Sequence, residues 1–505
     1  MSADESPEVG TASGRVRGTR EGKLAVFRGI PFAAPPVGPD RFAAPRPAAP
    51  WDGVRDAVAF GPTVPQETPE PVAGYGSDGS DEWLTVNVWT PEPDARAARP
   101  VMVWIYGGAY KYGSSSQPDY DGRLLVGEND VLLVTLNYRV GMEGFAAIEG
   151  APANRGLLDQ VAALEWVREN IAAFGGDPGR VTVFGESAGA GSIAALLAMP
   201  AARGLFQRAI AQSVPGTYFS SELAADIGRR LAGELGLRPT IADLAQLEPG
   251  KLATAGALLT PRMREYAREW GTVASTITPF SPIVDGEVLP RSPWQALADG
   301  AAREVELIAG HNRDEYRLFL GFDKKLGQVS EEEASEMLRV MGPGPEPETA
   351  YRTAFPDASA ELLYERVQSD RLFRMPTLRL AEAHVAGGGK AHVYELTYPA
   401  PTEGGALGAC HGLDVPLVFG VFGRLGAMLF GPDPSPEAHA LSAWWRRAWT
   451  AFATTGDPGW PEFDAARRTT CVIDVERTTA AYPEEISRRL WERHAFDASP
   501  LVGIG

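Results

Sequence analysis

The feature that most constrains this chain is an apolar segment followed at once by a sharp turn and a helix. Residues 181–184 read Val-Thr-Val-Phe, residues 185–189 read Gly-Glu-Ser-Ala-Gly, and a segment rich in small residues then continues to Pro200. Glycines on both sides of a serine are needed where a strand turns directly into a helix, because larger side chains would collide with the crossing backbone. Such a turn places the serine at the carboxyl end of a sheet and at a helix N-terminus. The segment predicts parallel α/β structure, with Ser187 as a candidate nucleophile.

Other segments extend the same pattern. Residues 101–106 and 131–136 are apolar without alternation, which is typical of strands buried on both faces of a parallel sheet. Apolar residues recur at spacings of three and four between 157 and 174, which predicts a helix that stops at the following glycines. Further strands are expected at 304–309 and 392–396. The sequence therefore predicts a central, mostly parallel sheet flanked by helices.

No internal repeat or long linker divides the 505 residues. We therefore expect a single domain over residues 1–505, even though the length exceeds that of a typical domain. Helical patterns at roughly 221–275 and 325–390 are interpreted as insertions that form a cap-like region over one face of the sheet.

Net charge, apolar runs and cysteine content limit which partners and which cellular compartment are expected for this chain. The net charge of −18 disfavours nucleic acid and anionic membrane surfaces as partners. No apolar run approaches the roughly 18 residues of a membrane span, and the acidic first residues do not resemble a secretory signal. Two cysteines, Cys410 and Cys471, cannot form a disulfide framework. We expect a cytoplasmic protein.

A serine nucleophile needs a histidine base, and the chain has six histidines. His411 lies in a loop, where catalytic groups tend to lie, and composition gives it only a small advantage over His311. Packing or surface positions account for the others, which are His384, His392, His439 and His494.

The acid is expected in a loop after a strand and before the histidine. Asp314 and Glu315 both satisfy this condition, and either could instead cap a helix or pair with Arg313. The oxyanion hole requires backbone N–H groups. The N–H of Ala188 is one candidate, and the Gly107-Gly108-Ala109 segment after an apolar run offers others.

These segments resemble the type-B carboxylesterase family of α/β-hydrolases, which includes cholinesterases and bacterial para-nitrobenzyl esterases. The resemblance covers nearly the whole chain. It is carried by residues 27–33, 35–38, 84–91, 137–141, 154–178 and 182–190.

The resemblance implies an α/β-hydrolase fold and assigns roles to matching positions. Ser187 falls on the acylated serine, Glu315 on the acid of an Asn-x-Asp-Glu pattern, and His411 on the base of a Gly-Ala-x-His pattern. Gly108, Ala109 and Ala188 fall on the oxyanion-hole amides. The sequence departs from the family pattern at three positions. Trp83 stands where secreted members have a cysteine, and Ala109 stands where the oxyanion loop has its third glycine. Tyr316 stands where glycine is usual.

The implied activity is hydrolysis of a small-molecule carboxylic ester through an acyl-enzyme, with no metal or organic cofactor. Two alternatives stay open: a carbamate or amide hydrolase with the same triad, and a non-catalytic binding relative. The sequence leaves the natural substrate open, as well as the choice between monomer and dimer.

Overall fold

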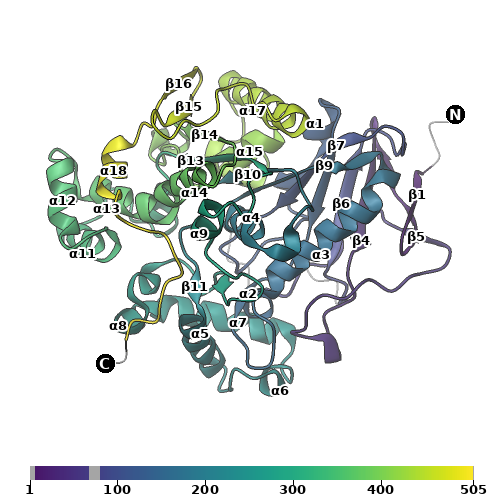
Figure 1. Cartoon of the computed structure of the whole chain (residues 1–505), viewed down its shortest axis with the longest axis horizontal. Helices are drawn as coiled ribbons and strands as arrows, with labels where there is room; N and C mark the ends of the chain where they lie inside the picture. The colour runs from purple at the N-terminus through teal and green to yellow at the C-terminus, as the bar shows by residue number, and fades with distance from the viewer. Residues whose placement is uncertain (1–5, 67–79, 504–505) are drawn as a thin grey trace.

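The computed structural model describes residues 6–66 and 80–503, and its centre is a twisted sheet of eleven strands (Figure 1). Strands β8, β7, β9, β10, β13, β14 and β15 pair in parallel, and antiparallel strands extend the sheet at both edges. Across the sheet the order is β16 (Arg477–Ala481), β15 (Thr469–Ile473), β14 (Ala391–Leu396), β13 (Glu306–Asn312), β10 (Arg208–Gln212), β9 (Gly176–Glu186), β7 (Arg99–Ile105), β8 (Leu132–Leu136), β6 (Thr85–Thr90), β4 (Leu24–Pro31) and β3 (Thr19–Glu21).

The predicted α/β fold is confirmed. Each expected strand is present, as β7, β8, β9, β13 and β14. All five residues of β8 and all six of β14 are buried, as expected where helices cover both faces.

Helices cover the sheet on both faces (Figure 1). One layer holds α3 (Arg155–Asn170), α4 (Ala188–Ala198), α9 (Pro293–Ala298) and α14 (Met375–Ala386). The other holds α1 (Arg123–Gly127), α15 (Asp414–Phe419) and α17 (Pro436–Thr455). The helix predicted at 157–174 is α3 with a short 3-10 extension, η3 (Ile171–Phe174), and Gly175 ends it with a φ of 94°.

The two predicted insertions are helical and differ in where they pack. The first comprises α5 (Ser221–Glu234), α6 (Ile241–Leu244), α7 (Pro249–Leu259) and α8 (Ala267–Trp270), and α7 packs on α2 (Gly141–Phe145). The second comprises α11 (Glu331–Met341), α12 (Pro347–Ala354) and α13 (Ala360–Ser369), which share a separate hydrophobic cluster with α10 (Arg317–Phe322).

The end of the second insertion differs from the sequence interpretation. A single π turn, η7 (Asp370–Arg374), joins α13 to α14, and α14 contacts β13 and β14. Leu378, Leu380 and Ala381 are fully buried there. The last part of the 325–390 segment is therefore a helix of the sheet layer, because its apolar face fits the sheet.

Smaller elements complete the fold. They are a sheet of β1 (Glu8–Thr11), β2 (Gly14–Arg17) and β5 (Val54–Asp56), the pair β11 (Phe219–Ser220) and β12 (Ile283–Val284), and helices α16 (Arg424–Phe430) and α18 (Glu485–Leu490). Within the described ranges, no helix has the length and apolar character needed to cross a bilayer.

Parallel pairing brings the predicted site residues to one edge of the sheet. Gln212 at the end of β10 pairs with Glu186 on one side and Gly310 on the other. The segments that follow β7, β9 and β13 thus leave the sheet at the same edge.

Candidate active site

Ser187 lies between β9 and α4 in a strained backbone conformation, with φ 56° and ψ −124°. Few non-glycine residues adopt a positive φ, and such strain is found where the surrounding structure holds it in place. The Ser187 N–H donates to the Gln212 carbonyl at 2.9 Å. A Cβ on Gly185 would lie 2.5 Å from the Ile105 carbonyl oxygen, and one on Gly189 would lie closer still. The two glycines are therefore required by the close crossing of β7, as the sequence predicts.

The predicted oxyanion residues surround the serine. Gly108 and Ala109 both have positive φ, at 116° and 56°. A Cβ on Gly107 would lie 3.1 Å from the Ser187 Cβ, so this loop passes directly beside the serine. Within residues 6–66 and 80–503, the N–H groups of Gly108 and Ala109 donate no hydrogen bond. Ala188 is the first residue of α4, where an N–H has no carbonyl partner inside the helix.

Glu315 binds His411 through a short contact between Oε2 and Nδ1, 2.6 Å long. Glu315 is fully buried. Its other oxygen, Oε1, accepts from the Ser213 hydroxyl at 2.6 Å and from the Asn312 N–H at 2.8 Å. With both oxygens occupied, Glu315 holds the imidazole with its proton on Nδ1, which leaves Nε2 able to accept a proton.

Nε2 of His411 faces a second carboxylate, Glu186 Oε1, at 3.0 Å. Burial would lower the pKa of His411, but Glu186 and Glu315 outweigh it and raise that pKa to about 9. Burial has the opposite effect on a carboxyl group: it raises the pKa of Glu186 to about 8, although His411 acts to lower that pKa. Phe373 of η7 packs against the imidazole with ring centroids 4.2 Å apart.

The structure thus brings the three predicted triad residues together, but one of the two hydrogen bonds of a triad is not formed. His411 and Glu315 are hydrogen-bonded, and the Nε2 edge of His411 reaches the residue next to Ser187. Among the described residues, Ser187 Oγ makes no hydrogen bond to His411. Catalytic hydrogen bonds of this kind often form fully only with substrate in place.

The competing candidates have other partners. Asp314 Oδ2 accepts from the Ala409 N–H at 2.9 Å and pairs with Arg313 at 3.2 Å, so it holds the loop that carries His411. His311 contacts the Tyr482 hydroxyl at 2.9 Å, and burial lowers its pKa to about 4. The remaining histidines contact backbone carbonyls or aromatic rings, His384 at Val305, His392 at Pro461, His439 at Phe422 and His494 at Trp491.

Sequence reasoning missed three residues of this site. Glu186 is the variable position of the Gly-x-Ser-x-Gly segment, so its proximity to Ser187 was the available signal. Ser213 follows β10 with φ 58°. Its position at the end of a strand was a weaker sequence signal. Phe373 gave none, because only the π turn of η7 brings it to His411.

Two departures from the family pattern leave the site intact. Tyr316 directly follows Glu315, donates its N–H to Ser369 Oγ at 2.9 Å, and packs its ring into the cluster of α11 and α13. Trp83 is buried, with its indole N–H on the Ser80 carbonyl at 3.1 Å.

A small cavity of about 40 Å³ adjoins Ser187. Besides Ser187, Ala109 and Ala188, its lining is mostly apolar or uncharged, with Ile277, Phe280, Leu372 and Phe373 among the residues. A group bound there would contact Ser187.

Comparison with known proteins gives a consistent result. A sequence model described as the carboxylesterase family matches residues 5–487. The chain is 37% identical to the para-nitrobenzyl esterase of Bacillus subtilis, over 95% of this chain and 97% of that one. It is 34% identical to the phenmedipham hydrolase of Pseudarthrobacter oxydans, over 96% and 99%.

Solved structures agree with the sequence matches. A carboxylesterase of Geobacillus stearothermophilus superposes with a TM-score of 0.83 at 36% identity, over 96% of this chain and 99% of that one. A para-nitrobenzyl esterase structure gives the same TM-score, identity and coverage.

Proposed function

Because the chain belongs to the carboxylesterase family, we propose that Ser187, His411 and Glu315 are the catalytic triad of a serine esterase. The chain is a carboxylic ester hydrolase. The observation that carries it is the 2.6 Å contact between Glu315 Oε2 and His411 Nδ1, which directs Nε2 toward the turn that holds Ser187.

In the proposed reaction, His411 Nε2 accepts the Ser187 Oγ proton as Oγ attacks the ester carbonyl. The N–H groups of Gly108, Ala109 and Ala188 hold the oxygen that becomes negative. His411 then gives the proton to the departing alcohol oxygen, which leaves an acyl group on Ser187. A water deprotonated by His411 releases the acid and restores the serine.

Glu186 enters this scheme as a buried charge beside the base. Ester cleavage requires a neutral His411 first and an imidazolium during the attack. A carboxylate 3.0 Å from Nε2 stabilises the imidazolium, in addition to Glu315.

We further propose aryl and benzyl esters as substrates, because a relative 37% identical over nearly the full chain is named para-nitrobenzyl esterase. The whole chain is proposed to act as one domain, since the main hydrophobic cluster includes residues from Val9 to Phe496 and only α10 to α13 form a cluster of their own. The cytoplasm is its proposed compartment, in keeping with two buried free thiols, Cys410 and Cys471.

The test is covalent labelling. An organophosphonate should inactivate the enzyme with one equivalent and label Ser187, and Ser187→Ala should neither take the label nor show a burst with para-nitrophenyl acetate. Labelling at another residue, or full turnover by Ser187→Ala, would reject the proposed nucleophile.

A further inference from the structure

The alcohol half of an ester has its own surroundings in this site. In the proposed reaction the departing alcohol oxygen receives its proton from His411 Nε2, so the alcohol half must lie beside Nε2 and the nearby Glu186 carboxylate. The small cavity at Ser187 is lined by neither His411 nor Glu186. The residues around Glu186 therefore bound the space that the alcohol half occupies.

One oxygen of Glu186 faces the oxyanion loop. A Cβ on Gly107 would lie 3.0 Å from Glu186 Oε2 and 3.1 Å from the Ser187 Cβ. A Cβ on the next residue, Gly108, would lie 3.1 Å from Cδ2 of the Tyr112 ring. The Glu186 carboxylate adds to the effect of burial in raising the pKa of Tyr112, as expected for two groups that lie near each other. The Tyr112 ring is therefore a neighbour of the alcohol space.

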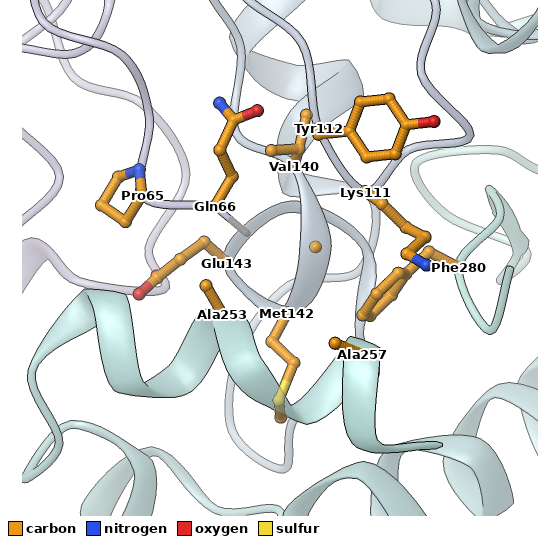
Figure 2. Close-up of a pocket in the computed structure, with 12 residues that line it drawn as sticks. Pro65, Gln66, Lys111, Tyr112, Val140, Met142, Glu143, Ala253, Ala257 and Phe280 are labelled. Carbon is orange, nitrogen blue, oxygen red and sulfur yellow. The ribbon is translucent and has the colours of Figure 1, made fainter. Parts of the chain in front are cut away.

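Tyr112 and the residue before it point in different directions. Figure 2 shows Lys111 reaching down to Phe280 in a cavity of about 370 Å³ between α2 and α7, whereas the Tyr112 ring extends away from α7. The Tyr112 side chain is partly exposed. Within residues 6–66 and 80–503, its hydroxyl makes no hydrogen bond and no other aromatic ring packs on it. The ring thus offers an apolar face to a bound molecule.

The other oxygen of Glu186 faces an aliphatic part of the site. A Cβ on Gly412 would lie 3.8 Å from Glu186 Oε1 and 3.9 Å from Cδ2 of Leu425 in α16. Gly412 follows His411 directly, so a side chain at this position would take up space near Nε2. The surroundings of the carboxylate are therefore apolar on both sides, with Leu425 beyond Oε1 and Tyr112 beyond Oε2.

We propose that Tyr112 binds the alcohol half of the substrate, with its ring packed against an aryl or benzyl leaving group, and that it sets the preference for aromatic over alkyl alcohols. The inference rests on the proposed function, because it uses the same Ser187 site and assigns one residue to the selection of the proposed substrates. A contact between two aromatic rings contributes roughly two- to tenfold in affinity beyond the area that it buries.

The test uses esters that share one acyl group. Every acetate ester forms the same acetyl-enzyme, so deacylation is common to all of them and differences in kcat/KM report on the alcohol half. The full chain is assayed with para-nitrobenzyl acetate and with ethyl acetate. Tyr112→Ala should lower the benzyl-to-ethyl ratio of kcat/KM by about tenfold, because the ring contact and its buried area are lost. Tyr112→Phe keeps the ring and should stay within about threefold of the wild-type ratio.

Two controls separate the alcohol half from the acyl half and from the loss of a tyrosine as such. Para-nitrobenzyl butyrate and acetate differ in the acyl group alone, so Tyr112→Ala should leave the ratio of kcat/KM between these two esters unchanged. Tyr266 is a partly exposed tyrosine in η5 (Thr260–Tyr266) that lines neither cavity, and its ring lies 4.6 Å from that of Trp270. Tyr266→Ala should leave both ratios as in wild type.

The outcomes separate the inference from the proposed function. An unchanged benzyl-to-ethyl ratio in folded Tyr112→Ala, with ester hydrolysis intact, would overturn the role of Tyr112 alone. An equally large change in the butyrate-to-acetate ratio would place Tyr112 on the acyl side and would also overturn it. Absence of hydrolysis of every ester by the wild type would instead reject the proposed function. Should Tyr112→Ala not fold, Tyr112→Leu takes its place, with a smaller decrease of the benzyl-to-ethyl ratio expected and an unchanged ratio again counting against the ring contact.

Discussion

The two edges of the His411 ring face opposite kinds of surroundings. At Nδ1, Glu315 is fully buried and each of its oxygens accepts a hydrogen bond. At Nε2, Glu186 Oε1 lies 3.0 Å away, and neither atom makes a hydrogen bond to any residue in 6–66 or 80–503. The Nδ1 side therefore fixes the orientation and tautomer of the ring, whereas the Nε2 side has unsatisfied hydrogen-bonding groups at the edge that the proposed mechanism turns toward the substrate.

The largest expected effect is on the Nδ1 side. In Glu315→Gln, the oxygen of the amide must take the Oε1 position, because the Asn312 N–H there is a donor. Its NH₂ group then faces His411 Nδ1, which becomes an acceptor and shifts the ring proton to Nε2. The base is lost, and turnover should fall by about 10⁴-fold, as for other acid-to-amide changes in triads. Turnover is measured above pH 9; a loss of less than tenfold would show that Glu315 does not set the tautomer.

The next effect is on the Nε2 side and appears in the pH profile. Activity requires neutral His411, so kcat/KM falls as the pH drops through the His411 pKa. Glu186, Glu315 and Asp414 are the carboxylates that raise this pKa, to about 9. Glu186→Gln removes the one nearest Nε2, so the His411 pKa decreases and the acid limb should move to lower pH by about one unit.

The same substitution should lower the plateau rate. A change of one pKa unit corresponds to about 1.36 kcal/mol of stabilisation of the imidazolium, which is roughly tenfold in rate. Because Glu186 and His411 titrate together, the profile reports apparent values of the pair. An acid limb at the same pH in Glu186→Gln and wild type would contradict this account of the Nε2 side.

The sequence predicted more of the Nδ1 side than of the Nε2 side, for physical reasons. Strand, turn and helix patterns are local, so the positions of Ser187 and of the loops after β7 and β13 follow from them. The choice of Glu315 over Asp314 came from the family pattern, and the geometry at His411 agrees with it. An unperturbed histidine would titrate near pH 6.5. The pKa of His411 is higher because three carboxylates, which only the folded chain brings together, outweigh the lowering effect of burial.

The contact of Phe373 with His411 and the packing of α14 on the sheet could not be predicted from the sequence, again because they depend on the folded chain. Both depend on the single π turn of η7, which changes the direction of side chains on a helix without a clear sequence signal. Similar helical periodicity also describes α11 and α14, although one lies in a separate hydrophobic cluster and the other on the sheet.

A smaller effect is expected from the residue that supports Glu315. Ser213→Ala removes the 2.6 Å hydrogen bond to Glu315 Oε1. The Asn312 N–H is then the one donor left to that oxygen among the described residues. A hydrogen bond to a charged group contributes about 1.5–3 kcal/mol, so turnover should fall roughly tenfold and the free energy of unfolding should decrease. Ser292→Ala is the matched control, because Ser292 is equally buried and its hydroxyl has no partner among the described residues. Equal losses in both variants would contradict a specific role for Ser213.

The smallest effect is expected at Asp314, one residue from the acid. Its Oδ2 accepts from the Ala409 N–H and pairs with Arg313, whose side chain is 41% exposed. In Asp314→Asn, the amide oxygen can keep the hydrogen bond to Ala409, and a partly exposed ion pair contributes little. The free energy of unfolding should decrease by about 1 kcal/mol, and turnover should change by no more than about threefold. Both quantities are measured beside those of Glu315→Gln. A loss of turnover in Asp314→Asn comparable to that of Glu315→Gln would mean that the orientation of the His411 loop, and not the charge at Nδ1, controls the base.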